Sequence, residues 1–182
     1  MIVDPRSYEV KDIRYIVRSA SEKDAAELSG LRCRIDGETD HMDREPGEAF
    51  LDAWAFAKLI REDSQRPRNL ILVAAVRERL VGYSRCEGVY LKRFAHKAEF
   101  GVGVLRQYWG YGIGRRLLER SIEWAQAAGI RKMTLNVTET NESAIRLYRS
   151  LGFEVEGKLI DDKRLGDGSY RNTLIMGRLS SG

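Results

Sequence analysis

The sequence has 182 residues, 43% hydrophobic and 32% charged, which is enough to bury one sizeable core and short for two. Its net charge of +4 comes from Lys and Arg residues scattered along the chain, so we expect no nucleic-acid partner. No stretch approaches the roughly 18 apolar residues of a membrane helix, and residues 1–20 lack the pattern of a secretion signal, which predicts no membrane partner and a cytoplasmic protein.

The chain is expected to form a single domain over residues 13–179, preceded by an N-terminal arm over 1–12 and followed by a polar tail over 180–182. The two cysteines, Cys33 and Cys86, are far apart and belong to no CxxC motif. Two cysteines are too few for a disulfide framework or a metal site. We therefore expect reduced, packed thiols and no metal.

The first part of the domain predicts a strand and two helices. Residues 13–18 alternate apolar and polar side chains like a strand, and Ser21 followed by Asp24 is typical of a helix start. Between residues 36 and 48 the chain becomes acidic and irregular, and apolar residues then recur at helical spacing over 50–60. The acidic stretch is therefore expected to be a loop between two helices.

The next segments predict an antiparallel meander and then alternating helices and strands. The expected strands cover 70–76, 80–90, 98–105, 133–137, 153–159 and 170–176. Helical periodicity predicts one helix from Ile113 to Ala125, which Gly129 stops, and a second helix over residues 142–150.

The stretch from Gln107 to Arg116 lies between a predicted strand and a predicted helix. Three glycines occupy alternating positions in it: Gly110, Gly112 and Gly114. Glycine can adopt the positive φ angles at which successive N–H groups converge, and the start of a helix adds further free N–H groups. Positive charge is added by Arg106, Arg115 and Arg116. These features predict a pyrophosphate-binding site, although the same glycines would also suit a simple tight turn.

Other nucleotide sites are disfavoured at this loop. The glycine spacing is neither G-x-G-x-x-G nor G-x-x-x-x-G-K-S/T, and the strands before it are predicted to be antiparallel. We therefore expect neither an NAD site nor an ATP site here.

Two motifs in the sequence resemble the GNAT superfamily of acetyltransferases. The pattern Q/R-x-x-G-x-G/A, which opens the helix after the fourth strand of that fold, fits residues 107–112. A second frame, from Trp109 to Gly114, has Trp in place of Arg or Gln. The pattern N-x-x-A-x-x-L-Y-x-x-x-G-F fits residues 141–153. The resemblance covers roughly residues 13–179 and is strongest in the second half.

The resemblance implies an α/β fold whose central sheet is mixed but mostly antiparallel. It implies about six to seven strands with helices on both faces, and a splay between the fourth and fifth strands. That splay would lie between Gly103 and Asn136. Glycines at 101 and 103 are compatible with a bulge there, which we expect.

The resemblance also implies that acetyl-CoA is the acetyl donor. The main chain of residues 102–104 would hold the pantetheine arm and residues 110–115 the pyrophosphate, while Asn141 would hold the arm from the far side. The full set of implied cofactor-binding residues is Val102, Gly103, Val104, Gln107, Gly110, Tyr111, Gly112, Ile113, Gly114, Arg115, Asn141 and Tyr148.

Three residues are candidates for proton transfer. Tyr148 matches the general-acid position of the family. A phenol with a pKa near 10 can protonate a leaving thiolate whose conjugate thiol has a pKa near 8.5. Glu99 is the candidate general base, Glu87 a weaker one, and an N–H of Gly103 or Val104 would stabilise the oxyanion. Tyr148 as a core tyrosine and Glu99 as a solvated side chain are the alternatives.

The acceptor is expected to be a primary amine of a small molecule or of a peptide N-terminus. Glu38 and Asp40 in the acidic loop would attract a cationic amine, whereas His41 and His96 are interpreted as solvated. The C-terminal part resembles spermidine, amino-acid and ribosomal-protein N-terminal acetyltransferases. Direct transfer in a ternary complex is the leading hypothesis, and a homodimer is possible. A non-catalytic module that binds or senses coenzyme A is the alternative.

Overall fold

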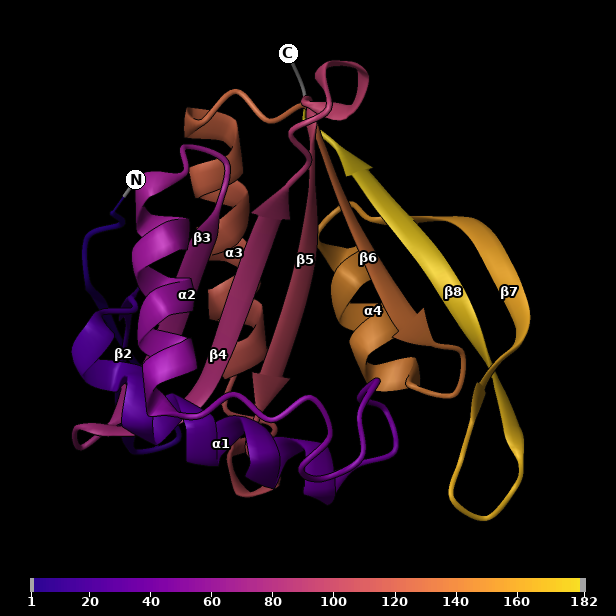
Figure 1. Cartoon of the computed structure of the whole chain (residues 1–182), viewed down its shortest axis with the longest axis horizontal. Coiled ribbons are helices and arrows are strands. Elements are labelled where there is room, and N and C mark those ends of the chain that lie inside the picture. Colours follow the sequence, from indigo (N-terminus) through magenta and orange to yellow (C-terminus); the bar gives the residue numbers. More distant parts are fainter. Residues whose placement is uncertain (1, 181–182) are drawn as a thin grey trace.

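The computed structural model describes residues 2–180 (Figure 1). Within this range eight strands form one sheet, in the order β1-β2-β3-β4-β5-β6-β8-β7. The strands are β1 (Arg6–Val10), β2 (Ile13–Ser19), β3 (Leu70–Val76), β4 (Arg79–Gly88), β5 (Lys97–Val104), β6 (Lys132–Thr138), β7 (Glu154–Arg164) and β8 (Tyr170–Leu179). The α-helices are α1 (Ala25–Glu38), α2 (Ala53–Gln65), α3 (Ile113–Ala127) and α4 (Glu142–Ser150).

Neighbouring strands are antiparallel except β5 and β6, which are parallel. The predicted fold class is therefore confirmed, with more strands than the six to seven expected. The additional strand is β1, in the segment expected to be an arm. It pairs with β2 through a turn in which Lys11 and Asp12 both have positive φ angles, and Tyr8 stacks on Tyr15 with ring centres 5.5 Å apart. Residues 1, 181 and 182 of the expected arm and tail lie outside the described residues.

The helices form two layers on opposite faces of the sheet. In Figure 1, α2 lies in front of the sheet and α3 behind it, while α1 crosses the lower end. The cluster under α1 and α2 includes Leu28, Ile35, Phe56, Ile60 and Leu105. The cluster under α3 and α4 includes Phe100, Ile113, Leu117, Leu135 and Tyr148. Each face of the sheet therefore has its own apolar core.

Two boundaries in the first half differ from the prediction. Helix α1 continues through Asp36 to Glu38, so the start of the expected acidic loop is the last turn of this helix. Helix α2 begins after Asp52, whose Oδ1 accepts a hydrogen bond from the N–H of Ala55 at 2.8 Å. Phe50 therefore lies before the helix and is exposed. The buried face of α2 starts at Phe56 and not at the expected positions 50 and 54.

The splay expected between β5 and β6 is present. The two strands pair only at Lys97↔Lys132, Ala98↔Met133 and Glu99↔Thr134, and then diverge as Figure 1 shows. They part because β6 pairs along its whole length with β8, which leads it away from β5.

The bulge expected at Gly101 and Gly103 is absent, because β4 and β5 keep a continuous register from Gly82↔Val104 to Gly88↔Ala98. Glycine at 103 has a different use. A Cβ there would lie 3.1 Å from Cγ2 of Ile35, so its absence lets α1 approach the sheet closely.

Both cysteines are free in the structure. Cys86 is buried and Cys33 is half-buried. Within residues 2–180, no helix is both long enough and apolar enough to span a membrane. The same residues contain no group of three or more His, Cys, Asp or Glu side chains placed to hold a metal ion.

A buried carboxylate joins α2 to β4. The side chain of Asp63 is 1% exposed, and its oxygens accept hydrogen bonds from Arg85 Nε at 2.7 Å and from Asn69 Nδ2 at 2.6 Å. We expect Asp63→Asn to lower the free energy of unfolding by about 2 kcal/mol, because charge-assisted bonds are lost and Arg85 keeps only Glu87 as partner. Urea denaturation measures the change. The matched control Glu62→Gln, on a half-exposed neighbour, should stay within about 0.5 kcal/mol of the parent, and equal midpoints for both variants would contradict the prediction.

Candidate active site

The gap between β5 and β6 exposes main-chain hydrogen-bonding groups. The N–H of Leu105 donates to the carbonyl of Val81 at 2.9 Å, and bonded pairs alternate along an antiparallel ladder. Odd-numbered residues of β5 are therefore bonded to β4, and Gly103 is among them. The N–H and C=O groups of Val102 and Val104 point the other way, into the gap. This corrects the expectation that Gly103 offers its main chain to a cofactor or an oxyanion.

The far edge of the gap is formed by β6. The N–H of Glu139 donates to the carbonyl of Asn172 at 2.9 Å, so odd-numbered residues on this strand are bonded to β8 and the main chain of Asn136 faces β5. The indole Nε1 of Trp109 donates to the carbonyl of Val104 at 2.8 Å. The N–H of Val104 and the N–H and C=O groups of Val102 and Asn136 therefore remain available in the gap. Such a row of main-chain groups suits an extended ligand that contains amides.

The glycine loop lies at the open end of this gap and leads into α3. Gly110 and Gly112 have φ angles of 81° and 75°, and Gly112 precedes the first residue of the helix. The N–H of Arg116 bonds to the carbonyl of Gly112 at 3.0 Å, so the N–H groups of residues 113–115 have no acceptor within the helix. Gly112 has no side chain to cap them. Free N–H groups and the positive end of the helix dipole favour a negative charge at this loop.

The arginines predicted near this loop have different surroundings. Arg115 donates to Ser150 Oγ on α4 at 2.8 Å. Arg116 bonds Glu119 at 2.7 Å and lies 5.0 Å from the ring centre of Tyr8. The charge nearest the helix start is therefore already shared with other groups.

The N-terminal hairpin supplies contacts that the sequence did not reveal. Tyr15 donates its hydroxyl to the carbonyl of Tyr111 at 3.2 Å, and Lys11 Nζ lies 5.8 Å from the ring centre of Tyr111. Lys11 was expected in an irregular arm, so no local pattern linked it to the loop. In contrast, Gln107 is exposed in the preceding turn, at Arg106–Tyr108.

Tyr148 lies on α4 in the apolar layer beneath Val102 and Val104. Its side chain is 7% exposed, and burial raises the pKa of its phenol to about 12. None of residues 2–180 hydrogen-bonds to its hydroxyl. Asn141 caps the same helix, since its Oδ1 accepts from the N–H of Ala144 at 3.2 Å and its amide nitrogen is left for another partner.

Glu99 lies on the opposite face of the sheet from Tyr148. Glu99 is the last residue of β5 that pairs with β6, and its side chain is exposed. It lies on the same face of the sheet as Gly103, which faces α1. Glu87 stands directly across on β4 but accepts a hydrogen bond from Arg85 at 2.8 Å, so it is already paired. Among described residues, nothing hydrogen-bonds to the Glu99 carboxylate. The two candidate proton-transfer groups therefore flank the gap from opposite faces.

The segment between α1 and α2 borders a hollow of about 340 Å³. It is lined by Gly37, Glu38, Thr39, Asp40, His41, Arg106 and Trp109. Glu38 accepts a hydrogen bond from the N–H of Arg106 at 2.6 Å, which joins this segment to the turn before the glycine loop. Burial lowers the pKa of His41. Glu38 and Asp40, the two residues predicted to contact the acceptor substrate, both line this cavity.

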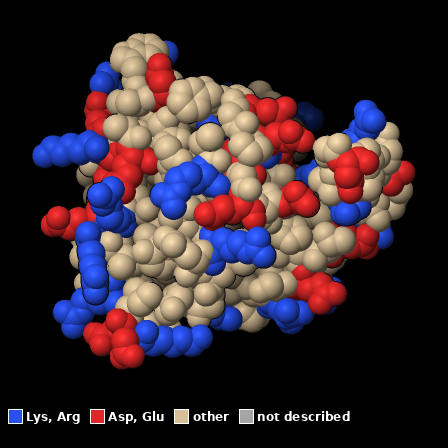
Figure 2. Space-filling view, turned by 90° about the horizontal axis from the view of Figure 1, so that it is seen from below, with Lys and Arg blue, Asp and Glu red and all other residues tan. Residues whose placement is uncertain are grey.

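Two other carboxylates of this segment are paired with basic side chains. Asp36 is paired with Arg44, and Asp43 with Lys163 from the β7–β8 hairpin. Figure 2, seen from below, shows positive and negative side chains mixed over this face. Arg44 belongs to the same run of residues as Asp36, whereas Lys163 comes from far along the chain.

Comparison with known proteins identifies the family. Residues 36–153 match the model of the Acetyltransferase (GNAT) family. The chain is 31% identical over 134 residues to spermidine N(1)-acetyltransferase of Escherichia coli (strain K12), covering 72% of this chain and 68% of that protein.

Two solved structures share the fold. A GNAT acetyltransferase from Streptococcus pneumoniae superposes with a TM-score of 0.88 at 29% identity, covering 91% of this chain and 99% of that chain. The structure of yncA from Salmonella typhimurium with its cofactor acetyl-CoA has a TM-score of 0.80 at 22% identity, covering 91% and 93%. From its sequence motifs, its splayed sheet and these matches, the chain belongs to the GNAT family of acetyltransferases.

Proposed function

We propose that this protein is an acetyl-CoA dependent N-acetyltransferase that acts on the primary amine of a small molecule or of a peptide N-terminus. The observation that carries the proposal is the β5–β6 gap, which has a glycine loop with free N–H groups at one end. A neighbour of the same fold, yncA, has acetyl-CoA as its cofactor, and a curated relative acetylates spermidine. Both support the choice of donor and of reaction.

The chain offers a fitting set of groups for the donor, which supplies an activated acetyl thioester when bound. The N–H groups of residues 110–115, with Lys11 and Arg115 nearby, would hold the pyrophosphate. The main chain of Val102 and Asn136 and the amide of Asn141 would hold the arm. The absence of a side chain at Gly114 supports this path, because a Cβ there would point between Leu147 of α4 and Val104 of β5, at 3.9 and 4.0 Å.

The chemistry follows from the groups on the two faces of the gap. Glu99 accepts a proton from the acceptor ammonium, directly or through water, to leave a neutral amine. As the C–N bond forms and the C–S bond breaks, the N–H of Val104 donates to the carbonyl oxygen that gains charge. Tyr148 gives its proton to the departing sulfur, the nitrogen loses its second proton to water, and the Tyr148 phenolate regains a proton from solvent. The products are therefore an N-acetyl amine and a free thiol.

The proposal is tested by measuring thiol release from acetyl-CoA with a panel of amines: spermidine, free amino acids and peptides with free N-termini. We expect amine-dependent turnover with at least one class, and a reaction without amine controls for hydrolysis. Calorimetric titration with coenzyme A separates the alternatives. Binding without turnover on any amine would support a coenzyme A sensing module, and absence of binding would refute the proposed donor site.

A further inference from the structure

Two arginines and one carboxylate lie on the α1–α2 face of the sheet, the face that also carries Glu99. Ile35 of α1 packs against Gly103, within 3.1 Å of the position of a Cβ. Arg32 and Asp36 are four residues apart and therefore form an adjoining stripe on the same helix. Arg44, from the segment after α1, bonds both oxygens of Asp36 at 3.0 Å.

Tyr83 of β4 connects this group to the strand that borders the gap. Its ring carbon Cε1 lies 3.4 Å from the Cβ position of Gly103. Burial raises the pKa of Tyr83, and the positive charges of Arg44 and Arg32 oppose that rise. Tyr83 and Ile35 thus both contact β5 at Gly103, on the face of the sheet that carries the charged group.

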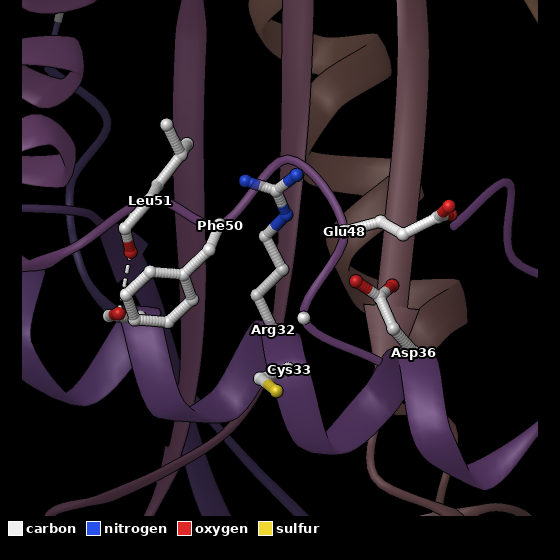
Figure 3. A pocket seen from close by; sticks show the side chains of 8 residues that line it. Arg32, Cys33, Asp36, Glu48, Phe50 and Leu51 are labelled. Atoms are coloured by element: carbon white, nitrogen blue, oxygen red, sulfur yellow. Dashed lines mark hydrogen bonds between the residues drawn. The ribbon is translucent and has the colours of Figure 1, made fainter. Parts of the chain in front are cut away.

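The charges in this group do not balance. Both oxygens of Asp36 are used by Arg44, and the Asp36 side chain is only 2% exposed. Arg32 is half-buried, and its side chain makes no hydrogen bond or ion pair with any of residues 2–180. In Figure 3 its guanidinium projects from α1 beneath the arch of chain at 47–51, while the carboxylate of Glu48 points away. One partly buried positive charge on this face of the sheet is thus left without a counter-ion among the described residues.

We propose that Arg32 binds a carboxylate on the acceptor, so that the favoured substrates are small amines that also carry a carboxylate, such as free amino acids. This inference rests on the proposed acetyl transfer. A guanidinium can hold a carboxylate through two parallel hydrogen bonds, which fixes the orientation of a small substrate. A partly buried guanidinium without a counter-ion gains more from such a ligand than one in water does.

The same positive charge disfavours a polyamine. Two guanidinium groups against one carboxylate repel an ammonium group and lower the pKa of an amine bound nearby. A lower amine pKa helps catalysis, since only the neutral amine can attack. An amino acid gains this advantage and is still attracted through its carboxylate, whereas spermidine has only positive groups to offer.

The experiment compares each free amino acid with its carboxamide as acceptor, with spermidine as a third substrate. For the preferred side chain, kcat/KM should be about 30-fold higher for the acid than for the amide. Arg32→Gln should remove this ratio, and Arg32→Lys should restore part of it. The matched control Arg34→Gln, an exposed arginine on the same helix, should leave the ratio unchanged.

Several results would overturn the proposal. Equal kcat/KM for acid and amide in the parent protein would do so without any variant, as would a preference for spermidine. An equal loss on acid and amide in Arg32→Gln would assign Arg32 a structural role. Calorimetric binding of amino acids to the coenzyme A complex gives a readout without turnover. If no amino acid binds to the coenzyme A complex, the proposal is overturned. Coenzyme A binding and turnover of other amines report separately on the proposed acetyl transfer.

Discussion

Replacing Tyr148 by Phe is expected to lower kcat for acetyl transfer by about 100- to 1000-fold, because general acids contribute factors of this order. The change removes only the hydroxyl, and the ring keeps its contact with Phe153 at a centre distance of 6.0 Å. The affinity for coenzyme A should therefore stay within about threefold of the parent value. Steady-state kinetics and calorimetric titration measure the two quantities.

The raised pKa of Tyr148 is compatible with this role. Burial raises the pKa of Tyr148 to about 12. A phenol with this pKa is protonated at neutral pH, which is the form that a general acid needs.

The pH dependence gives an independent test of Tyr148. A group whose pKa is raised keeps its proton to higher pH, so kcat should show no alkaline decline from Tyr148 between pH 7 and about pH 10. Tyr170→Phe, at an exposed tyrosine of β8, is the matched control and should keep the parent kcat. An unchanged kcat in Tyr148→Phe, or an alkaline limb near pH 8 that this variant abolishes, would contradict the assignment.

Local signals in the sequence were enough to place several elements. Helix α4 occupies residues 142–150 as predicted, because Asn141 caps it and Ile145 and Tyr148 recur at helical spacing on the buried side. The β3–β4 hairpin also follows its local pattern, with positive φ angles at Arg77 and Glu78 in the turn. In both segments the residues that decide the structure are close together in the sequence.

The differences from prediction arise where distant segments meet. Asp36 belongs to a buried helical turn because Arg44 neutralises it, and β1 exists because it pairs with β2. The direction of the Gly103 main chain follows from strand register, which no pattern within β5 specifies. Arg32 stands out only when its lack of a partner is visible. Pairing, register and charge compensation are properties of the folded chain.

The second large effect is expected at the proposed pyrophosphate-binding site, where Gly114→Asp should raise the Kd for coenzyme A by about 100-fold. A Cβ at this position would meet Leu147 and Val104 at 3.9 and 4.0 Å, which are ordinary contacts, so the fold should accept a side chain. The carboxylate would lie in the passage between α3 and α4, close to where the phosphates are proposed to bind. Repulsion between charges about 4 Å apart is worth up to about 4 kcal/mol near a protein surface, and a 100-fold change in Kd corresponds to about 2.7 kcal/mol.

The isosteric control Gly114→Asn separates charge from bulk. It should raise the Kd only about tenfold, because it occupies the same space without the charge. The Asp variant should not be less stable than the Asn variant, since an acidic residue in the first turn of α3 favours the helix dipole. The difference in Kd between the two should shrink as salt is added, because screening weakens the repulsion. Calorimetry at two salt concentrations decides the matter: equal affinities for the two variants would mean that the negative charge of coenzyme A does not lie at the start of α3.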